Sequence, residues 1–286
     1  MNFISLDQFY KDIVTWERQL PYFDAVCGVP RSGLLPASII ALRRNIRLVD
    51  LDSLLRDPSA AIQNAPIRQS NPIIRYNKRS GNKLLVVDDS ASNQTTTISA
   101  IREALKDCKD LEISYAAVYR ASSASTVDHY FKEVPLPRMF GWNWFRHWEL
   151  QFALLDIDGV LCEDWKLKQE QNEDPTYIDH LVNVKPLYIP DVPVLGLVTS
   201  RLSRYRELTE TWLKKNQVMY KKLHMHPATT PEERRKMNDH AQRKADVYLR
   251  TPEAPLFVES DIRQAQRIFE LAKKPVLCID TMTCLS

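Results

Sequence analysis

The chain has 286 residues, of which 44% are hydrophobic and 26% are charged, and its formal net charge is +3. This balance is typical of a globular protein, and the length allows one large domain or two domains of ordinary size. The small net charge disfavours a nucleic-acid partner, and the lack of any run of about 18 apolar residues excludes a membrane span as a prediction.

Strand and helix patterns alternate through the first half of the chain. An amphipathic helix is expected at 5–20, and its early acidic residues argue against a signal peptide. Five cysteines without a CxxC pair favour a reducing, cytoplasmic location. The elements expected next are, in order, a strand at 24–29, a helix at 35–44, a strand at 47–51, a loop at 57–82, a strand at 84–89, a helix at 95–108 and a strand at 111–120. This alternation predicts a parallel sheet with helices on its faces.

The pattern starts again after an aromatic segment at 139–150, MFGWNWFRHWEL. The elements expected there are, in order, a strand at 152–158, a polar and irregular stretch with short helical patches at 162–190, a strand at 192–200, helices at 204–216 and 243–250, a strand at 255–260, a helix at 261–274 and a strand at 275–280. We therefore expect an α/β protein of two domains, 1–148 and 149–286, each a mainly parallel sheet with flanking helices.

Two acids follow the first strand of the second half, in FALLDIDGV. Asp156 and Asp158 are one residue apart, so both can face the same pocket at the carboxyl end of a parallel strand. Close carboxylates repel unless a cation lies between them, and Mg²⁺ binds oxygen ligands together with phosphate. The alternative is a solvated DxDG turn. Further polar groups arrive at later strand ends or on a neighbouring helix: Thr199, Lys244, Glu259 and Asp261.

This order of motifs, DIDGV, then VTS, then a lysine, then an acidic strand end, resembles the haloacid-dehalogenase-like (HAD) phosphatases over about 152–280. The resemblance implies a Rossmann-like fold with a small cap insert and a Mg²⁺-dependent hydrolase. Asp156 resembles the nucleophile and Asp158 the general acid and base. Thr199 and Lys244 resemble the groups that position phosphate. The metal ligands would be Asp156 and Asp158 with Asp261, Glu259 or both; a surface role for Lys244 stays open.

A second acidic strand end lies in the first half, in LLVVDDSASNQTTTI. Asp88 and Asp89 are adjacent, so in an extended strand they point to opposite faces. That geometry suits two hydroxyl acceptors at a turn, or one ligand and one structural acid. The hydroxyl-rich residues that follow open a helix, where N–H groups bind anions. The alternative is an ordinary helix N-cap cluster.

Together with GVPRSG after the preceding strand, this motif resembles the type I phosphoribosyltransferases. The resemblance implies that Asp88 and Asp89 bind the ribose hydroxyls of phosphoribosyl pyrophosphate (PRPP) and that the pyrophosphate meets 29–33. The PRPP-binding residues expected from it are Arg31, Ser32, Gly33, Asp88, Asp89, Ser90, Ala91, Ser92, Asn93, Gln94, Thr95 and Thr96. Gln94 departs from the glycine usual in the family. A mobile flap is expected within 63–82.

The joined architecture resembles uncharacterised bacterial and phage proteins, related to tellurite-resistance-associated ones, that fuse a phosphoribosyltransferase-like domain to a HAD-like phosphatase. It implies a bifunctional enzyme of nucleotide metabolism, which transfers a phosphoribosyl group between PRPP and a nucleobase and hydrolyses a phosphate monoester with Mg²⁺. The alternative is a PRPP- or nucleotide-sensing domain that regulates an active phosphatase. A homodimer, the base and the ester stay open. A basic stretch near 201–236 contains acids throughout, so a solvated helix face is favoured over RNA binding.

Overall fold

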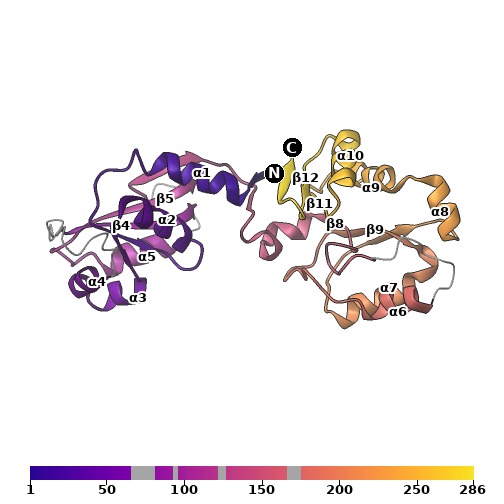
Figure 1. The fold of residues 1–286 in the computed structure, drawn as a ribbon, viewed down its shortest axis with the longest axis horizontal. Coiled ribbons are helices and arrows are strands. Elements are labelled where there is room, and N and C mark those ends of the chain that lie inside the picture. Colours follow the sequence, from indigo (N-terminus) through magenta and orange to yellow (C-terminus); the bar gives the residue numbers. More distant parts are fainter. Residues whose placement is uncertain (66–80, 93–95, 122–126, 166–174) are drawn as a thin grey trace, which may run out of the picture. The chain divides into compact units, whose positions relative to one another are not determined.

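The computed structural model describes residues 1–65, 81–92, 96–121, 127–165 and 175–286. The chain divides into two compact units. The N-terminal unit consists of residues 6–138 with Asn2, and the C-terminal unit of residues 139–286 with Met1 and residues 3–5. Each unit contains its own sheet with flanking helices, as the sequence predicts (Figure 1).

The sheet of the N-terminal unit has five strands in the order β3-β2-β4-β5-β6, and every neighbouring pair is parallel. Its elements are α1 (Leu6–Trp16), β2 (Ala25–Gly28), α2 (Leu34–Arg44), β3 (Arg47–Val49), α3 (Leu51–Arg56), α4 (Pro58–Asn64), β4 (Lys83–Ala91), α5 (Thr96–Ala104), β5 (Glu112–Arg120) and β6 (His129–Glu133). The central strands are continuous apolar runs, because a parallel sheet is covered on both faces. Leu84, Leu85, Val86 and Val87 are accordingly all fully buried.

Two parts of this unit differ from the prediction. The expected loop at 57–82 contains helix α4, which begins at an N-cap: Asp57 accepts a hydrogen bond from the Ala60 N–H, and Pro58 occupies the first turn. Asp50 caps α3 in the same way through the Ser53 N–H. Of these two caps, Asp57 lies in the expected loop and Asp50 in the strand expected at 47–51, and both residues are of a type that favours the N-cap position. Most of the expected flap, residues 66–80, lies outside the described residues.

The sheet of the C-terminal unit has six strands in the order β10-β9-β8-β11-β12-β13, and only the edge strand β13 is antiparallel to its neighbour. A separate two-stranded sheet pairs β1 (Asn2–Ile4) with β7 (Arg138–Phe140). Three 3-10 helices are η1 (Trp144–Arg146), η2 (Trp148–Phe152) and η3 (Ser203–Tyr205). The strands of the six-stranded sheet and the helices of the unit are β8 (Leu154–Leu155), α6 (Pro175–Asn183), β9 (Gly196–Leu202), α7 (Arg206–Lys215), β10 (Leu223–His226), α8 (Pro231–Met237), α9 (His240–Leu249), β11 (Phe257–Glu259), α10 (Ile262–Ala272), β12 (Val276–Cys278) and β13 (Thr283–Leu285).

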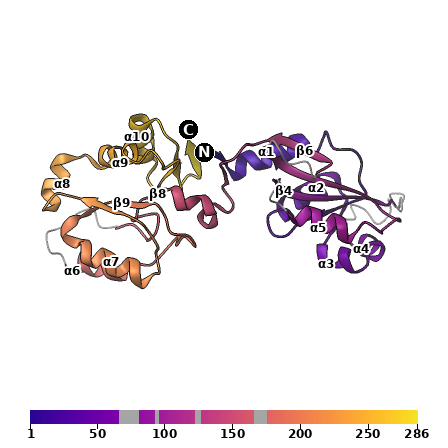
Figure 2. The ribbon, with the colours of Figure 1, turned by 180° about the vertical axis from the view of Figure 1, so that it is seen from behind.

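Alternate residues of the strands build two cores on opposite faces of this sheet. Leu154 and Phe257 pack with residues of α9 and α10. Their chain neighbours Leu155 and Val258 pack with Trp212 of α7. Helices α9 and α10 therefore cover one face and α7 covers the other, which Figure 2 shows from behind. This layering places the carboxyl ends of β8, β9 and β11 at one edge.

The contact boundary between the units falls between residues 138 and 139, ahead of the expected boundary between 148 and 149. The difference arises because the aromatic segment is packed as core: Met139, Trp144 and Leu150 are buried in the cluster that contains Leu155. Within the expected irregular stretch at 162–190, the structure shows helix α6, while residues 166–174 lie outside the described residues. No helix in the described part of the chain is long and apolar enough to span a membrane.

Candidate functional site

The carboxyl edge of the C-terminal sheet brings the predicted phosphatase residues to one cavity. Asp156 directly follows β8, and Glu259 ends β11 beside it in the sheet. The cavity measures about 280 Å³ and is lined by Asp156, Asp158, Asp164, Trp165, Tyr177, Ser200, Arg201, Arg234, His240, Lys244, Glu259, Ser260, Asp261 and Gln264. Gly159 turns the chain away after the acids with φ +77°, where a Cβ atom would collide with the Ser260 side chain.

Lys244 of α9 lies at the centre of the site and is almost fully buried. Its Nζ atom donates to Asp156 Oδ2 and to Glu259 Oε2, both at 2.6 Å, and to Gln264 Oε1 at 3.0 Å. Burial opposes its charge, but Asp156 and Glu259 together raise the pKa of Lys244. The surface role left open for this lysine is therefore excluded by its position.

The negative charge of Asp156 is paired with the Lys244 ammonium group. Its Oδ1 atom accepts a hydrogen bond from the Ile157 N–H at 2.7 Å. Burial raises the pKa of Asp156 well above the ordinary value for an aspartate, and the charges of Glu259 and Asp158 add to the rise although Lys244 opposes it. The pocket therefore has an excess of negative charge that a further cation would relieve.

Asp158 is bound by a cation that was not singled out from the sequence. Arg201, with 1% of its side chain exposed, donates from Nη2 to Asp158 Oδ1 at 2.6 Å and from Nε to Oδ2 at 3.0 Å. Burial alone would raise the pKa of Asp158, but Arg201 lowers it below the ordinary value. The signal was available in VTSR, because residues two apart on a strand share a face and Thr199 was already a candidate.

Thr199 lies beside Asp158 and Arg201. It was expected at the end of its strand, but β9 continues to Leu202, so Thr199 lies within the strand. Its hydroxyl is 3.5 Å from Asp158 Oδ2 and accepts a hydrogen bond from the Arg201 N–H at 3.1 Å. The structure therefore brings Asp156, Asp158 and Lys244 into one cavity with Arg201, while Thr199 contacts Asp158 and Arg201 without lining that cavity.

Two of the four predicted metal ligands already make hydrogen bonds to other groups of the protein. The Asp261 carboxylate caps α10 by accepting the Gln264 N–H at 2.8 Å, and the Asp158 carboxylate is paired with Arg201. Within the described ranges, no three His, Cys, Asp or Glu side chains converge to hold a metal ion. Asp156 Oδ2 and Glu259 Oε2 both accept from Lys244 Nζ, so the two carboxylates lie close together. Such a pair fits Mg²⁺, since this ion commonly binds one or two carboxylates together with phosphate and water.

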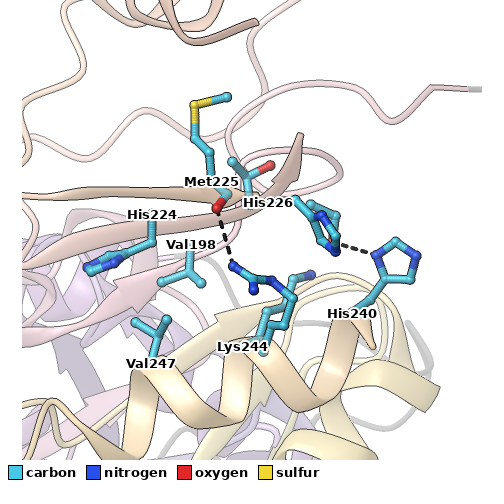
Figure 3. Close-up of a pocket in the computed structure, with 10 residues that line it drawn as sticks. Val198, His224, Met225, His226, His240, Lys244 and Val247 are labelled. Atoms are coloured by element: carbon cyan, nitrogen blue, oxygen red, sulfur yellow. Dashed lines mark hydrogen bonds between the residues drawn. The ribbon is translucent and has the colours of Figure 1, made fainter. Parts of the chain in front are cut away.

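A second, much smaller cavity of about 10 Å³ adjoins this pocket (Figure 3). His240 and Lys244 lie one turn apart on α9 at its wall, and His240 Nδ1 is 2.9 Å from the Ser200 hydroxyl. Burial first, and then nearby cations, lower the pKa of His240 to about 4. The ring is therefore neutral near pH 7, and the space suffices for about one water molecule.

In the N-terminal unit, Asp88 and Asp89 lie inside β4 and are both buried. Asp88 is opposite Ala117 in the ladder with β5, so the strand is still extended there. The Asp89 N–H donates to Asp88 Oδ1 at 2.8 Å. Burial, followed by the charge of Asp89, raises the pKa of Asp88 to about 8.

Asp89 has different surroundings, which include the buried cation Arg138. Burial lowers the pKa of Arg138, and the charge of Asp89 offsets part of this effect. The guanidinium group donates to the Ala91 and Val134 carbonyl oxygens, each at 3.1 Å. The charge of Asp89 also acts on Tyr119, whose hydroxyl donates to Asp12 at 2.6 Å. The two acids of this pair therefore have different surroundings within one strand.

The loop at 29–33 follows β2 and lies against β4. The Val29 N–H donates to the Val87 carbonyl at 2.9 Å, and the Pro30–Arg31 peptide bond is cis. A Cβ atom at Gly33 would lie 2.6 Å from the Val29 oxygen and 2.7 Å from the Val87 oxygen, so this close packing requires glycine. Arg31 is exposed and Ser32 is half-buried. The loop and the end of β4 therefore share one edge of the sheet.

The hydroxyl-rich loop after β4 is described only in part. Ser90 and Ala91 belong to the strand, and Ser92 follows it. Asn93, Gln94 and Thr95 lie outside the described residues, and α5 begins at Thr96. The loop therefore leads into the N-terminus of a helix, as the sequence predicts.

Comparison with known proteins matches residues 12–150 to the phosphoribosyl transferase domain. Similar solved structures include a xanthine-guanine-hypoxanthine phosphoribosyltransferase of Helicobacter pylori (19% identity, 49% of this chain and 92% of that chain, TM-score 0.35) and a purine phosphoribosyltransferase of Pyrococcus horikoshii (18%, 49% and 92%, 0.35). An orotate phosphoribosyltransferase of Aeropyrum pernix is 18% identical over 44% of this chain and 69% of that chain, with a TM-score of 0.30. Scores at this level carry no argument about substrate. The residues that match this domain include the loop at 29–33 and the acids Asp88 and Asp89.

Proposed function

We propose that the chain is a bifunctional enzyme of nucleotide metabolism. Its N-terminal unit transfers a phosphoribosyl group between PRPP and a nucleobase, and its C-terminal unit hydrolyses a phosphate monoester with Mg²⁺. The hydrolase is supported by the hydrogen bonds that join Lys244 to Asp156 and Glu259 at the carboxyl edge of a parallel sheet. The Asp158–Arg201 ion pair lies beside them. Phosphate ligands bind at such edges.

In the first step of hydrolysis, an Asp156 oxygen attacks phosphorus, the aspartyl-phosphate bond forms, and the bond to the alcohol oxygen breaks. Lys244 holds the nucleophile by its 2.6 Å hydrogen bond. Arg201 Nη1 is buried without a hydrogen-bond partner among the described residues, so it is free to donate to a phosphate oxygen. Mg²⁺ bound by Asp156 and Glu259 would neutralise charge on the phosphate.

Asp158 serves the proton transfers. The incoming phosphate dianion raises its pKa, and contact of Arg201 with phosphate weakens the cation that otherwise lowers it. Protonated Asp158 then gives its proton to the leaving oxygen. In the second step Asp158 takes a proton from water, the water oxygen attacks phosphorus, and Asp156 is released with orthophosphate.

In the transfer reaction, a base nitrogen forms a bond to C1′ of PRPP while the bond from C1′ to pyrophosphate breaks. Asp88 is the proposed acceptor for a ribose hydroxyl, because Asp89 already faces Arg138. The loop at 29–33 would meet the pyrophosphate, and the N-terminus of α5 would meet the 5′-phosphate. The domain match at 12–150 supports this half.

One observation supports the sensor as a second candidate. Asp88 is mostly protonated near pH 7, since its pKa is about 8, and a neutral carboxyl is a weaker acceptor for a hydroxyl than a carboxylate. A sensor binds PRPP without pyrophosphate release and changes the phosphatase rate. The test supplies PRPP, Mg²⁺ and a panel of purine and pyrimidine bases. Pyrophosphate release with any base supports transfer, whereas a PRPP-dependent phosphatase rate without release supports sensing.

A further inference from the structure

The cavity of the C-terminal unit has two chemically different linings. Asp156, Lys244 and Glu259 form a lining suited to phosphate and a cation. Trp165 and Tyr177 contribute aromatic rings to the same cavity, with centroids 5.3 Å apart and planes at 73°. An aromatic lining has no part in the cleavage of a phosphate ester, so it points to the group attached to that phosphate.

Two further rings pack against the aromatic rings of Trp165 and Tyr177. His180 lies 4.9 Å from Trp165, and Tyr205 lies 5.5 Å from Tyr177, both measured between ring centroids. Tyr177 and Tyr205 are each 5% exposed and belong to one apolar cluster with Leu181. The rings are therefore fixed by packing before a ligand arrives.

Four buried polar atoms in this group have no hydrogen-bond partner within the described part of the chain. They are Trp165 Nε1, His180 Nε2, Arg201 Nη1 and Tyr205 Oη. Buried polar groups are nearly always paired in folded proteins, and an unpaired one costs about 1–3 kcal/mol. Trp165 and Arg201 both line the cavity. Arg201 Nη1 is assigned to the phosphate, so the unpaired Trp165 N–H is the donor that remains for the group attached to that phosphate.

We propose that Trp165 and Tyr177 form a subsite for the nucleobase of a nucleoside monophosphate whose phosphate lies at Asp156 and Lys244. A nucleobase has flat faces for the rings and acceptor atoms on its edge for the indole N–H. The cavity of about 280 Å³ is small for a ligand site, which selects a mononucleotide over a larger ligand. This inference rests on the proposed hydrolase function and names its substrate class.

The first test compares the kcat/KM values for AMP and for ribose 5-phosphate, which has the phosphate and sugar but no base. Removal of one base–aromatic contact lowers binding by about 1–3 kcal/mol, so Trp165→Ala is expected to reduce the AMP to ribose 5-phosphate ratio by roughly 5- to 150-fold. Trp165→Phe keeps a ring and is expected to retain most of the ratio. Trp148→Ala, at a side chain 53% exposed, is the matched control and is expected to keep the wild-type ratio. An unchanged ratio in Trp165→Ala overturns the subsite while leaving the hydrolase intact.

A second readout does not depend on turnover. The indole N–H signal of Trp165 in a ¹⁵N spectrum is assigned by its loss in Trp165→Phe. AMP is expected to shift this signal at concentrations where ribose 5-phosphate does not, while the Trp148 signal stays in place. If wild type hydrolyses neither ester, the proposed hydrolase fails, and the subsite is judged by this spectrum alone. A Trp165 signal that AMP leaves unmoved contradicts the subsite in either case.

Discussion

The buried carboxyl group of Asp88 makes the stability of the N-terminal unit depend on pH in a direction opposite to that of most acids. In the folded protein Asp88 keeps its proton up to about pH 8, because it is buried beside Asp89. The unfolded chain releases the same proton near pH 3.9. Between these values the folded state binds one more proton, so stability is lost as pH rises, by about 1.4 kcal/mol per pH unit.

Asp88→Asn removes this titration and keeps an oxygen that can accept the Asp89 N–H. We expect the variant to gain stability relative to wild type by about 2.7 kcal/mol between pH 5.5 and pH 7.5. The assay is amide hydrogen exchange of peptides from β4 and β5, with protection factors corrected for intrinsic exchange. The ratio of protection factors, variant over wild type, should rise about tenfold per pH unit. Asp107→Asn, at an exposed carboxyl of the same unit, should give a flat ratio. A flat ratio for Asp88→Asn would refute the burial argument for Asp88.

Further changes test the two proposed sites separately. Asp156→Asn should reduce Mg²⁺-dependent hydrolysis of a generic phosphate ester at least about a hundredfold, because an amide cannot attack phosphorus, and EDTA should stop the wild type; unchanged hydrolysis would show that the nucleophile is misassigned. Arg201→Lys should lower kcat by about tenfold or more, since a lysine cannot bind Asp158 through two nitrogens and also reach phosphate; a wild-type kcat argues against that contact. Asp88→Ala combined with Asp89→Ala should weaken PRPP binding in calorimetry while ester hydrolysis stays within a few-fold; unchanged affinity in the folded variant would sink the ribose assignment. Gln94→Gly should tighten PRPP binding if the glutamine obstructs the phosphate loop, and equal affinities would show that it does not.

The sheet architecture was predictable because its signals are local. Apolar runs that end in acids, as at Val87–Asp88 and Leu155–Asp156, identify strands of a parallel sheet and the edge at which ligands bind. The sequence also predicted that Lys244 and Glu259 reach the same edge as Asp156, which the 2.6 Å hydrogen bonds confirm.

The details that could not be predicted depend on contacts between distant residues. Arg138 looks like an ordinary surface residue in the sequence, and only the fold shows that it is buried near the charge of Asp89. The Asp261 carboxylate caps α10, a contact that its spacing from Asp156 did not indicate, and its role as a metal ligand stays a prediction. The domain boundary expected between 148 and 149 stays a prediction; contacts within the chain divide it between 138 and 139, because the aromatic segment packs in the core that contains Leu155.

The proposed function requires that one chain join a base to phosphoribose and remove a phosphate from an ester. The most direct test is ³¹P NMR of the full chain with PRPP, Mg²⁺ and each base of the panel in turn. Pyrophosphate and a nucleotide phosphate signal should appear with at least one base, and orthophosphate should then grow as the nucleotide signal falls. In Asp156→Asn the nucleotide should accumulate without that orthophosphate. No pyrophosphate with any base, or equal release of orthophosphate from the nucleotide by Asp156→Asn, would contradict a bifunctional enzyme.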